Sequence, residues 1–107
     1  KTLEEKRKLT QWITRELKKM KKVQIVLEPQ TAIGGFRYFE NGKNLQELNE
    51  LNQKLLNQIN SDGRILLSSI ELNGIFTIRI IPFGQSTHFR EVSLTKTLIS
   101  SALLRIP

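Results

Sequence analysis

The arginine at position 79 is the side chain whose surroundings most suggest binding chemistry. It lies within LNGIFTIRIIPFG, residues 72–84, an almost continuous apolar segment that is typical of a buried strand. A guanidinium without a partner is costly to bury. We therefore expect Arg79 to lie at a sheet edge, to form a structural ion pair, or to bind an anionic ligand. Arginine suits the last role because its planar group donates two parallel hydrogen bonds to one carboxylate.

The remaining reactive side chains do not form a recognisable catalytic or metal site. His88 is the only histidine, and the chain has no cysteine, so disulfides and thiolate metal sites are excluded. The absence of cysteine also favours a cytoplasmic protein. The segment Ile33-Gly34-Gly35 lacks the lysine and the later glycine of a phosphate-binding loop. No apolar run approaches the roughly 18 residues that span a membrane.

The elements that must position Arg79 follow the order α-β-β-α-β-β-α. Apolar spacing and cap signals predict helices over 3–20 and 45–59, a last helix that begins after Ser86 or Thr87, and strands over 23–29, 32–39, 64–72 and 75–83. The sequence therefore predicts one α+β domain over residues 1–107, in which a small antiparallel sheet packs with helices.

The dipeptide Asn73-Gly74 between two strand patterns predicts a hairpin with a type I′ turn. This turn places Ser68 opposite Arg79, where its hydroxyl can assist binding. It also gathers apolar residues on the same face of the hairpin, namely Leu66, Ile70, Leu72, Ile75 and Ile81. We expect the chain's own helices to cover this face incompletely, unless the first helix crosses it, so that a second copy or another domain packs there.

Arg37, in the strand sequence GGFRYF, is expected to be exposed and to pair with Glu28 or Glu40. Positive charge is concentrated elsewhere: residues 1–22 hold nine of the 17 Lys and Arg residues, and the net charge is +7. A basic helix can bind RNA or another polyanion, which makes a stand-alone binding module the alternative function. A solvated helix face is the simpler interpretation, and no aromatic side chain among the lysines is placed to stack on bases. Nucleic acid is therefore not the expected partner.

Three motifs occur in an order that is familiar from one enzyme family. They are Phe36-Arg37-Tyr38, then Leu55-Leu56-Asn57 with Ile59-Asn60, then Ile78-Arg79 leading towards Thr87. Together they resemble the C-terminal small domain of the group II pyridoxal-phosphate-dependent amino-acid decarboxylases, which include aromatic amino acid, glutamate, histidine and diaminobutyrate decarboxylases. The resemblance covers nearly the whole chain and implies the fold of the C-terminal domain of fold-type-I pyridoxal-phosphate enzymes.

The resemblance implies that residues 1–107 are the C-terminal domain of a longer, homodimeric decarboxylase. In this family an N-terminal large domain carries pyridoxal phosphate and its lysine, and the small domain closes one side of the active site. The chain alone is then expected to bind no cofactor and to have no activity. The arginine at the position of Arg79 can hold the α-carboxylate of the amino-acid substrate in glutamate-decarboxylase-like members. The loop PFGQS, residues 82–86, departs from the family in having Pro82 and Gly84 where Asn or Arg is usual.

Overall fold

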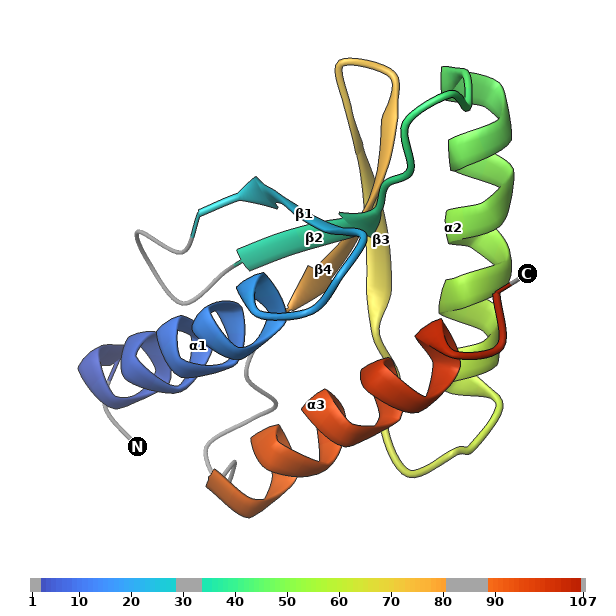
Figure 1. Cartoon of the computed structure of the whole chain (residues 1–107). Coiled ribbons are helices and arrows are strands. Elements are labelled where there is room, and N and C mark those ends of the chain that lie inside the picture. The colour runs from blue at the N-terminus through green and yellow to red at the C-terminus, as the bar shows by residue number, and fades with distance from the viewer. Residues whose placement is uncertain (1–2, 29–33, 81–88, 107) are drawn as a thin grey trace.

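Three helices and a four-stranded antiparallel sheet make up the described part of the chain (Figure 1). The computed structural model describes residues 3–28, 34–80 and 89–106. The elements in chain order are α1 (Leu3–Lys18), β1 (Val23–Leu27), β2 (Gly34–Tyr38), α2 (Leu45–Asn60), β3 (Ser68–Leu72), β4 (Ile75–Ile80) and α3 (Phe89–Leu103). The predicted α+β class and the α-β-β-α-β-β-α order are therefore confirmed.

The sheet has the strand order β1-β2-β4-β3, so Arg79 lies on an interior strand rather than at an edge. The predicted hairpin register is confirmed, with Ser68 opposite Arg79 and Leu72 opposite Ile75. Asn73 and Gly74 have φ angles of 52° and 81°, as a type I′ turn requires. The pairing expected between Leu66 and Ile81 lies outside the described residues.

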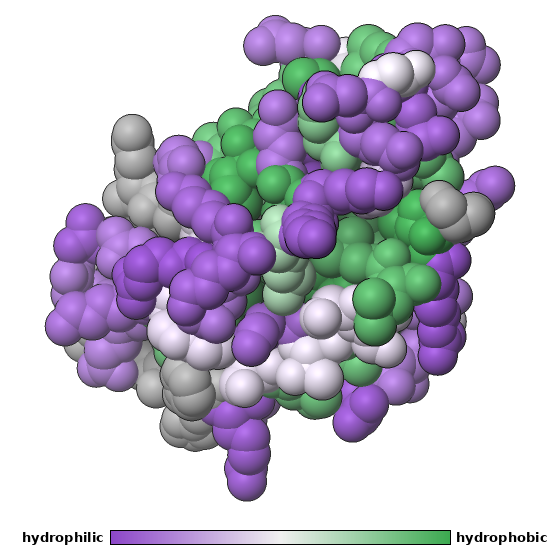
Figure 2. Space-filling view, in the orientation of Figure 1, coloured by the Kyte–Doolittle hydropathy of each residue, from purple (hydrophilic) through white to green (hydrophobic). Residues whose placement is uncertain are grey.

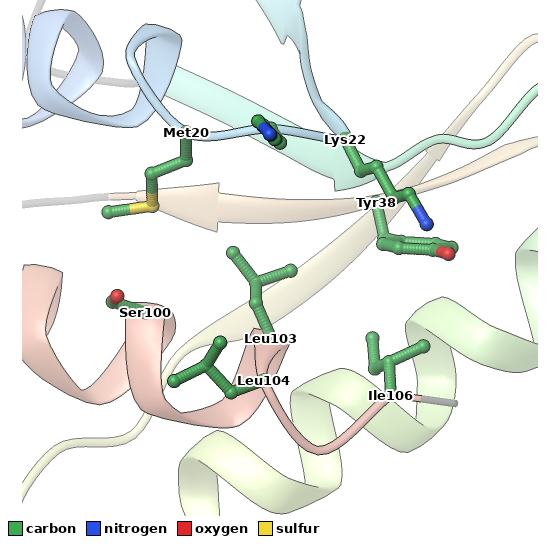
Figure 3. A pocket seen from close by; sticks show the side chains of 8 residues that line it. Met20, Lys22, Tyr38, Ser100, Leu103, Leu104 and Ile106 are labelled. Carbon is green, nitrogen blue, oxygen red and sulfur yellow. The ribbon is translucent and has the colours of Figure 1, made fainter.

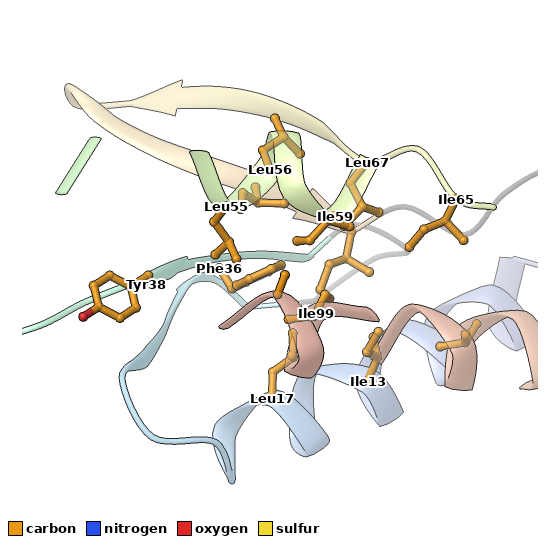
Figure 4. Packing of buried hydrophobic residues seen from close by; sticks show 14 of the residues in the cluster. Ile13, Leu17, Phe36, Tyr38, Leu55, Leu56, Ile59, Ile65, Leu67 and Ile99 are labelled. Carbon is orange, nitrogen blue, oxygen red and sulfur yellow. The ribbon is translucent and has the colours of Figure 1, made fainter. Parts of the chain in front are cut away.

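The hydrophobic core lies between one face of the sheet and the three helices, and we call this the helix face (Figure 4). Phe36 and Ile78 are paired on neighbouring strands and are both fully buried. Ile13 of α1, Leu55 of α2 and Ile99 of α3 belong to the same buried cluster. Because side chains alternate along a strand, the intervening residues point to the opposite side, which we call the outer face.

The outer face carries the residues that the hairpin register placed there, together with their neighbours on β1 and β2. By the observed pairing, its strand residues are Gln24, Leu27, Gly35, Arg37, Ser68, Ile70, Leu72, Ile75, Thr77 and Arg79. Ile70 is 36% exposed, Leu72 and Ile75 are half-buried, and Leu66 before β3 is 68% exposed. For the described residues of this face the expectation of incomplete cover by the helices is confirmed, and Ile81 lies outside the described residues. Helix α1 does not cross it, because Gly34 faces Thr10 and Thr14 of α1 from the helix face.

Helix α2 is joined to the sheet by the side chains of three asparagines. Asn49 accepts from Phe76 N and donates to Gly74 O, and Asn52 binds both backbone groups of Tyr38. Asn60 binds both backbone groups of Leu67. The prediction of a strand over 64–72 is therefore wrong for its first four residues. There the Leu67 backbone pairs with a helix side chain instead of a neighbouring strand.

The ends of the elements agree with most of the expected local signals. Asn44 and Glu47 form a reciprocal capping box at the start of α2, and Gly63 after that helix has a φ of 85°. The cap residues expected before α1 and α3, and His88, lie outside the described residues. Figure 2 shows hydrophilic side chains over α1 and α2, with apolar surface between them. None of the described helices is long and apolar enough to cross a membrane.

Candidate functional site

Arg79 lies on the outer face with a guanidinium that has a neutral partner. Its Nε donates to Ser68 Oγ at 3.1 Å, and the side chain is half-buried. No described carboxylate forms an ion pair with it, although a structural ion pair was one of the three expectations. Because β4 is an interior strand, the expectation that Arg79 lies at a sheet edge is wrong. Of the three expectations, binding of an anion is the one that the described residues leave open.

Gly35 lies opposite Arg79 on β2 and has no side chain that could cover the outer face there. A Cβ at this position would lie 2.8 Å from Thr77 Cγ2 and 3.2 Å from Leu27 Cβ. Such distances force the neighbours to move, so the close approach of Thr77 and Leu27 requires glycine here. The glycines of this segment, which lacks the features of a phosphate-binding loop, therefore mark close packing of the backbone.

Arg37 is buried, and the expectation that it would be exposed is wrong. It is 7% exposed and shares the outer face with Arg79. Its Nε donates to Gln24 Oε1 at 2.5 Å, and its Cζ lies 5.0 Å from the centre of the Phe39 ring. Nη1 is enclosed and has no hydrogen-bond partner. Burial lowers the pKa of this guanidinium, but arginine titrates so far above neutral pH that it remains charged.

The two carboxylates expected to pair with Arg37 are engaged elsewhere. Glu28 forms an ion pair with Lys18 at 3.1 Å. Glu40 accepts a hydrogen bond from the Tyr38 hydroxyl and lies 3.6 Å from Lys22 Nζ. Arg37 does not meet these glutamates because β2 is an interior strand, so its outer-face side chains are flanked by those of β1 and β4. Both glutamates instead come after the ends of strands. Sequence alone could not show this, because GGFRYF contains no sign of which strands flank it.

A pocket of about 320 Å³ opens on the helix side, between the C-terminal ends of α1 and α3 (Figure 3). Met20, Leu103, Leu104 and Ile106 give it an apolar lining, and Tyr38 closes one side. Burial, together with the Glu40 carboxylate, raises the pKa of Tyr38 to about 12. The phenol therefore stays protonated near neutral pH and is not a base there.

The described residues do not form a site for pyridoxal phosphate or a metal. No described lysine is buried, whereas a lysine that bonds the cofactor needs a pocket that lowers its pKa. Among the described residues there is also no group of three or more His, Asp or Glu side chains that could hold a metal ion. The described residues can offer a cofactor-binding protein a surface and an arginine, but not a buried lysine.

The basic first helix is partly neutralised by neighbouring carboxylates. Arg7 lies 2.7 Å from Glu4, and Lys19 lies 2.9 Å from Glu16. The ion pairs of Lys18 and Lys22 with glutamates outside the helix add to this. Exposed pairs of this kind contribute little stability, but they reduce the positive potential that a polyanion would meet. No observation on this helix favours the alternative of an RNA-binding module.

Comparison of the sequence with curated proteins finds two tyrosine decarboxylases. Tyrosine decarboxylases 3 and 4 of Petroselinum crispum are each 45% identical to this chain over 53 residues, which is 49% of this chain and 10% of theirs. The chain resembles the pyridoxal-phosphate-dependent amino-acid decarboxylases. This confirms the resemblance inferred from its motifs. No family model matches the chain.

Solved structures show that the fold is shared over nearly the whole chain. Tryptophan decarboxylase of Catharanthus roseus, solved with L-tryptophan, superposes with a TM-score of 0.89 over 98% of this chain at 20% identity. TDC of Oryza sativa, solved with PLP and tryptamine, gives 0.88 over 98% at 14% identity. This chain covers 22% and 23% of those two chains. It therefore corresponds to about a fifth of each of these proteins.

Proposed function

We propose that this chain is the C-terminal domain of a pyridoxal-phosphate-dependent amino-acid decarboxylase, a cytoplasmic homodimer in its complete form. The observation that carries the proposal is the shared fold over 98% of the chain, together with 45% identity to two tyrosine decarboxylases over 53 residues. The limited share of each relative that the chain covers supports a role as one domain of a larger enzyme. Aromatic amino acids are the first substrates to test, because the curated relatives are tyrosine decarboxylases.

In this proposal the outer face of the sheet packs on the N-terminal large domain and closes one side of the active site. Ile70 on this face and Leu66 just before β3 are large apolar side chains that are exposed, and exposed apolar side chains gathered on one face are typical of an interface. Pyridoxal phosphate, bound by the large domain, supplies the electron sink for loss of the carboxyl group. None of the described lysines is buried in a pocket where it could bond the cofactor. The chain alone is therefore expected to be inactive.

Arg79 is the proposed substrate-binding residue. It stands on the outer face, and among the described residues its hydrogen-bond partner is the neutral Ser68 hydroxyl, which binds Nε and leaves both η nitrogens without a described partner. The Ser68 contact orients the guanidinium through Nε and leaves its charge unneutralised. A carboxylate bound there would receive charge-assisted hydrogen bonds from a group already held in place.

The experiment compares the complete enzyme with its Arg79→Lys variant. Lysine keeps the charge but loses the two-pronged geometry. A charge-assisted hydrogen bond contributes about 1.5–3 kcal/mol, so we expect KM to rise about ten- to a hundredfold while pyridoxal phosphate content is unchanged. Arg64→Lys is the matched control, because Arg64 is exposed and pairs with Asp62 in the turn after α2.

Two results would contradict the proposal at different levels. An unchanged KM with a lowered melting temperature would make Arg79 a structural residue and leave the decarboxylase assignment intact. Absence of carbon dioxide release from any tested amino acid by the complete protein, loaded with pyridoxal phosphate, would overturn the assignment itself.

A further inference from the structure

Arg37 is an unsatisfied buried cation, and the proposed substrate-binding role of Arg79 does not explain it. The residue is 7% exposed, yet among the described residues its guanidinium donates a hydrogen bond only to the neutral Gln24 side chain. Contact with the Phe39 ring offsets part of the desolvation. Nη1 donates to nothing. A buried cation without a carboxylate partner is costly, so this arrangement is unfavourable for the chain by itself.

The charges on the outer face have one sign. Its described strand residues include the two arginines, Arg37 and Arg79, and no Asp or Glu. Glu71, the acidic residue of β3, pairs with Phe76 and therefore points to the helix face. The outer face thus combines exposed apolar side chains with two guanidiniums that lack acidic partners. The surface that complements it is apolar and carries carboxylates.

A second copy of this chain does not provide such a surface through the same face. In a symmetric pair of outer faces the described strand residues of each copy would offer the other only apolar, neutral polar and positively charged side chains. Such a contact would leave Arg37 and Arg79 without a carboxylate and would add positive charge on both sides of the interface.

We propose that Arg37 anchors the sheet to the large domain of the same polypeptide by binding a carboxylate of that domain. This inference rests on the proposed function, which supplies the large domain. The Gln24 and Phe39 contacts hold the guanidinium near the outer face before docking, and the incoming carboxylate accepts from the η nitrogens after a small rotation of the side chain. Before docking, the guanidinium without a carboxylate partner destabilises the domain. After docking it forms an interdomain ion pair that is buried and therefore weakly screened by salt.

Arg37→Met is expected to act differently in the 107-residue chain and in the complete enzyme. Arg37→Met keeps an unbranched side chain of similar length and removes the charge. In the 107-residue chain it is expected to leave the urea midpoint of unfolding unchanged or to raise it, because the unpaired guanidinium is gone. In the complete, cofactor-loaded enzyme it is expected to increase backbone hydrogen exchange at least tenfold across the hairpin 68–80 and across the surface of the large domain that covers it.

Arg64→Met is the matched control, since Arg64 is exposed outside this face, and it should leave hairpin exchange unchanged. Unchanged exchange in the complete Arg37→Met enzyme would overturn the proposal. So would protection of the hairpin that rises with protein concentration in the 107-residue chain, because this would identify a second copy as the occupant. A lowered urea midpoint in the 107-residue chain would assign Arg37 to internal structure. If that chain does not fold, the exchange experiment decides alone.

The two proposals fail in distinguishable ways. An active enzyme with unchanged exchange in Arg37→Met rejects the anchor and keeps the decarboxylase assignment. A complete protein that lacks decarboxylase activity, but whose hairpin exchange rises in Arg37→Met, rejects the assigned reaction and keeps the anchor.

Discussion

The amide of Asn52 is expected to be the most costly polar group to remove from the junction of α2 and the sheet. It is fully buried, its Oδ1 accepts from Tyr38 N at 2.7 Å, and its Nδ2 donates to Tyr38 O at 3.0 Å. We choose Asn52→Leu because leucine has a similar volume and a good helix propensity. The substitution therefore removes hydrogen bonds without leaving a large cavity.

The size of the effect follows from the two backbone groups that are left behind. In Asn52→Leu the Tyr38 N–H and C=O remain buried without their partner, and each orphaned group costs about 1–3 kcal/mol. We expect a loss of about 2–6 kcal/mol in the free energy of unfolding. Domains of this size have about 5–15 kcal/mol in total, so the variant is expected to be marginally folded.

The assay is urea unfolding of the 107-residue chain, followed by circular dichroism. Asn57→Leu is the matched control, because Asn57 is an exposed residue of the same helix whose side chain, among the described residues, accepts a hydrogen bond only from Gln53. Its effect should lie within about 0.5 kcal/mol of zero. If the two variants unfold at the same urea concentration, with equal m values, the hydrogen bonds of Asn52 do not stabilise the fold and this reasoning is refuted.

Three further outcomes are expected. Gly35→Ala should lower the free energy of unfolding by about 1–3 kcal/mol through overpacking against Thr77. The added substitution Thr77→Ser should restore part of this stability, because it removes Cγ2. If the double variant is no more stable than Gly35→Ala, the strain does not arise from the contact with Thr77. Tyr38 is the only tyrosine, so phenolate absorbance reports its titration directly. Because its folded pKa of about 12 exceeds the unfolded value near 10, the fold binds the proton more tightly, and stability should fall as pH rises from about 10 to 12 in wild type but less in Tyr38→Phe. Incubation of the chain with pyridoxal phosphate and borohydride should label no single lysine stoichiometrically, because no described lysine is buried; one fully labelled site would contradict this.

Local patterns in the sequence determined most of the secondary structure. The capping box at Asn44 and the Asn73-Gly74 turn each depend on residues a few positions apart, so their chemistry acts wherever the segment is placed. The turn also determined the register of β3 and β4, and with it the position of Ser68 opposite Arg79. The order of motifs was enough to indicate the decarboxylase resemblance.

Tertiary structure decided the environment of each candidate side chain. The order β1-β2-β4-β3 makes β2 and β4 interior, which buries Arg37 and removes Arg79 from the edge. The Leu67 backbone binds Asn60 instead of a strand, which shortens the expected strand. In each case the deciding partner is distant in sequence or belongs to another element, and a single sequence does not specify which elements become neighbours. The absence of carboxylates among the described strand residues of the outer face emerges only when four strands are placed side by side, because acidic residues occur throughout the sequence.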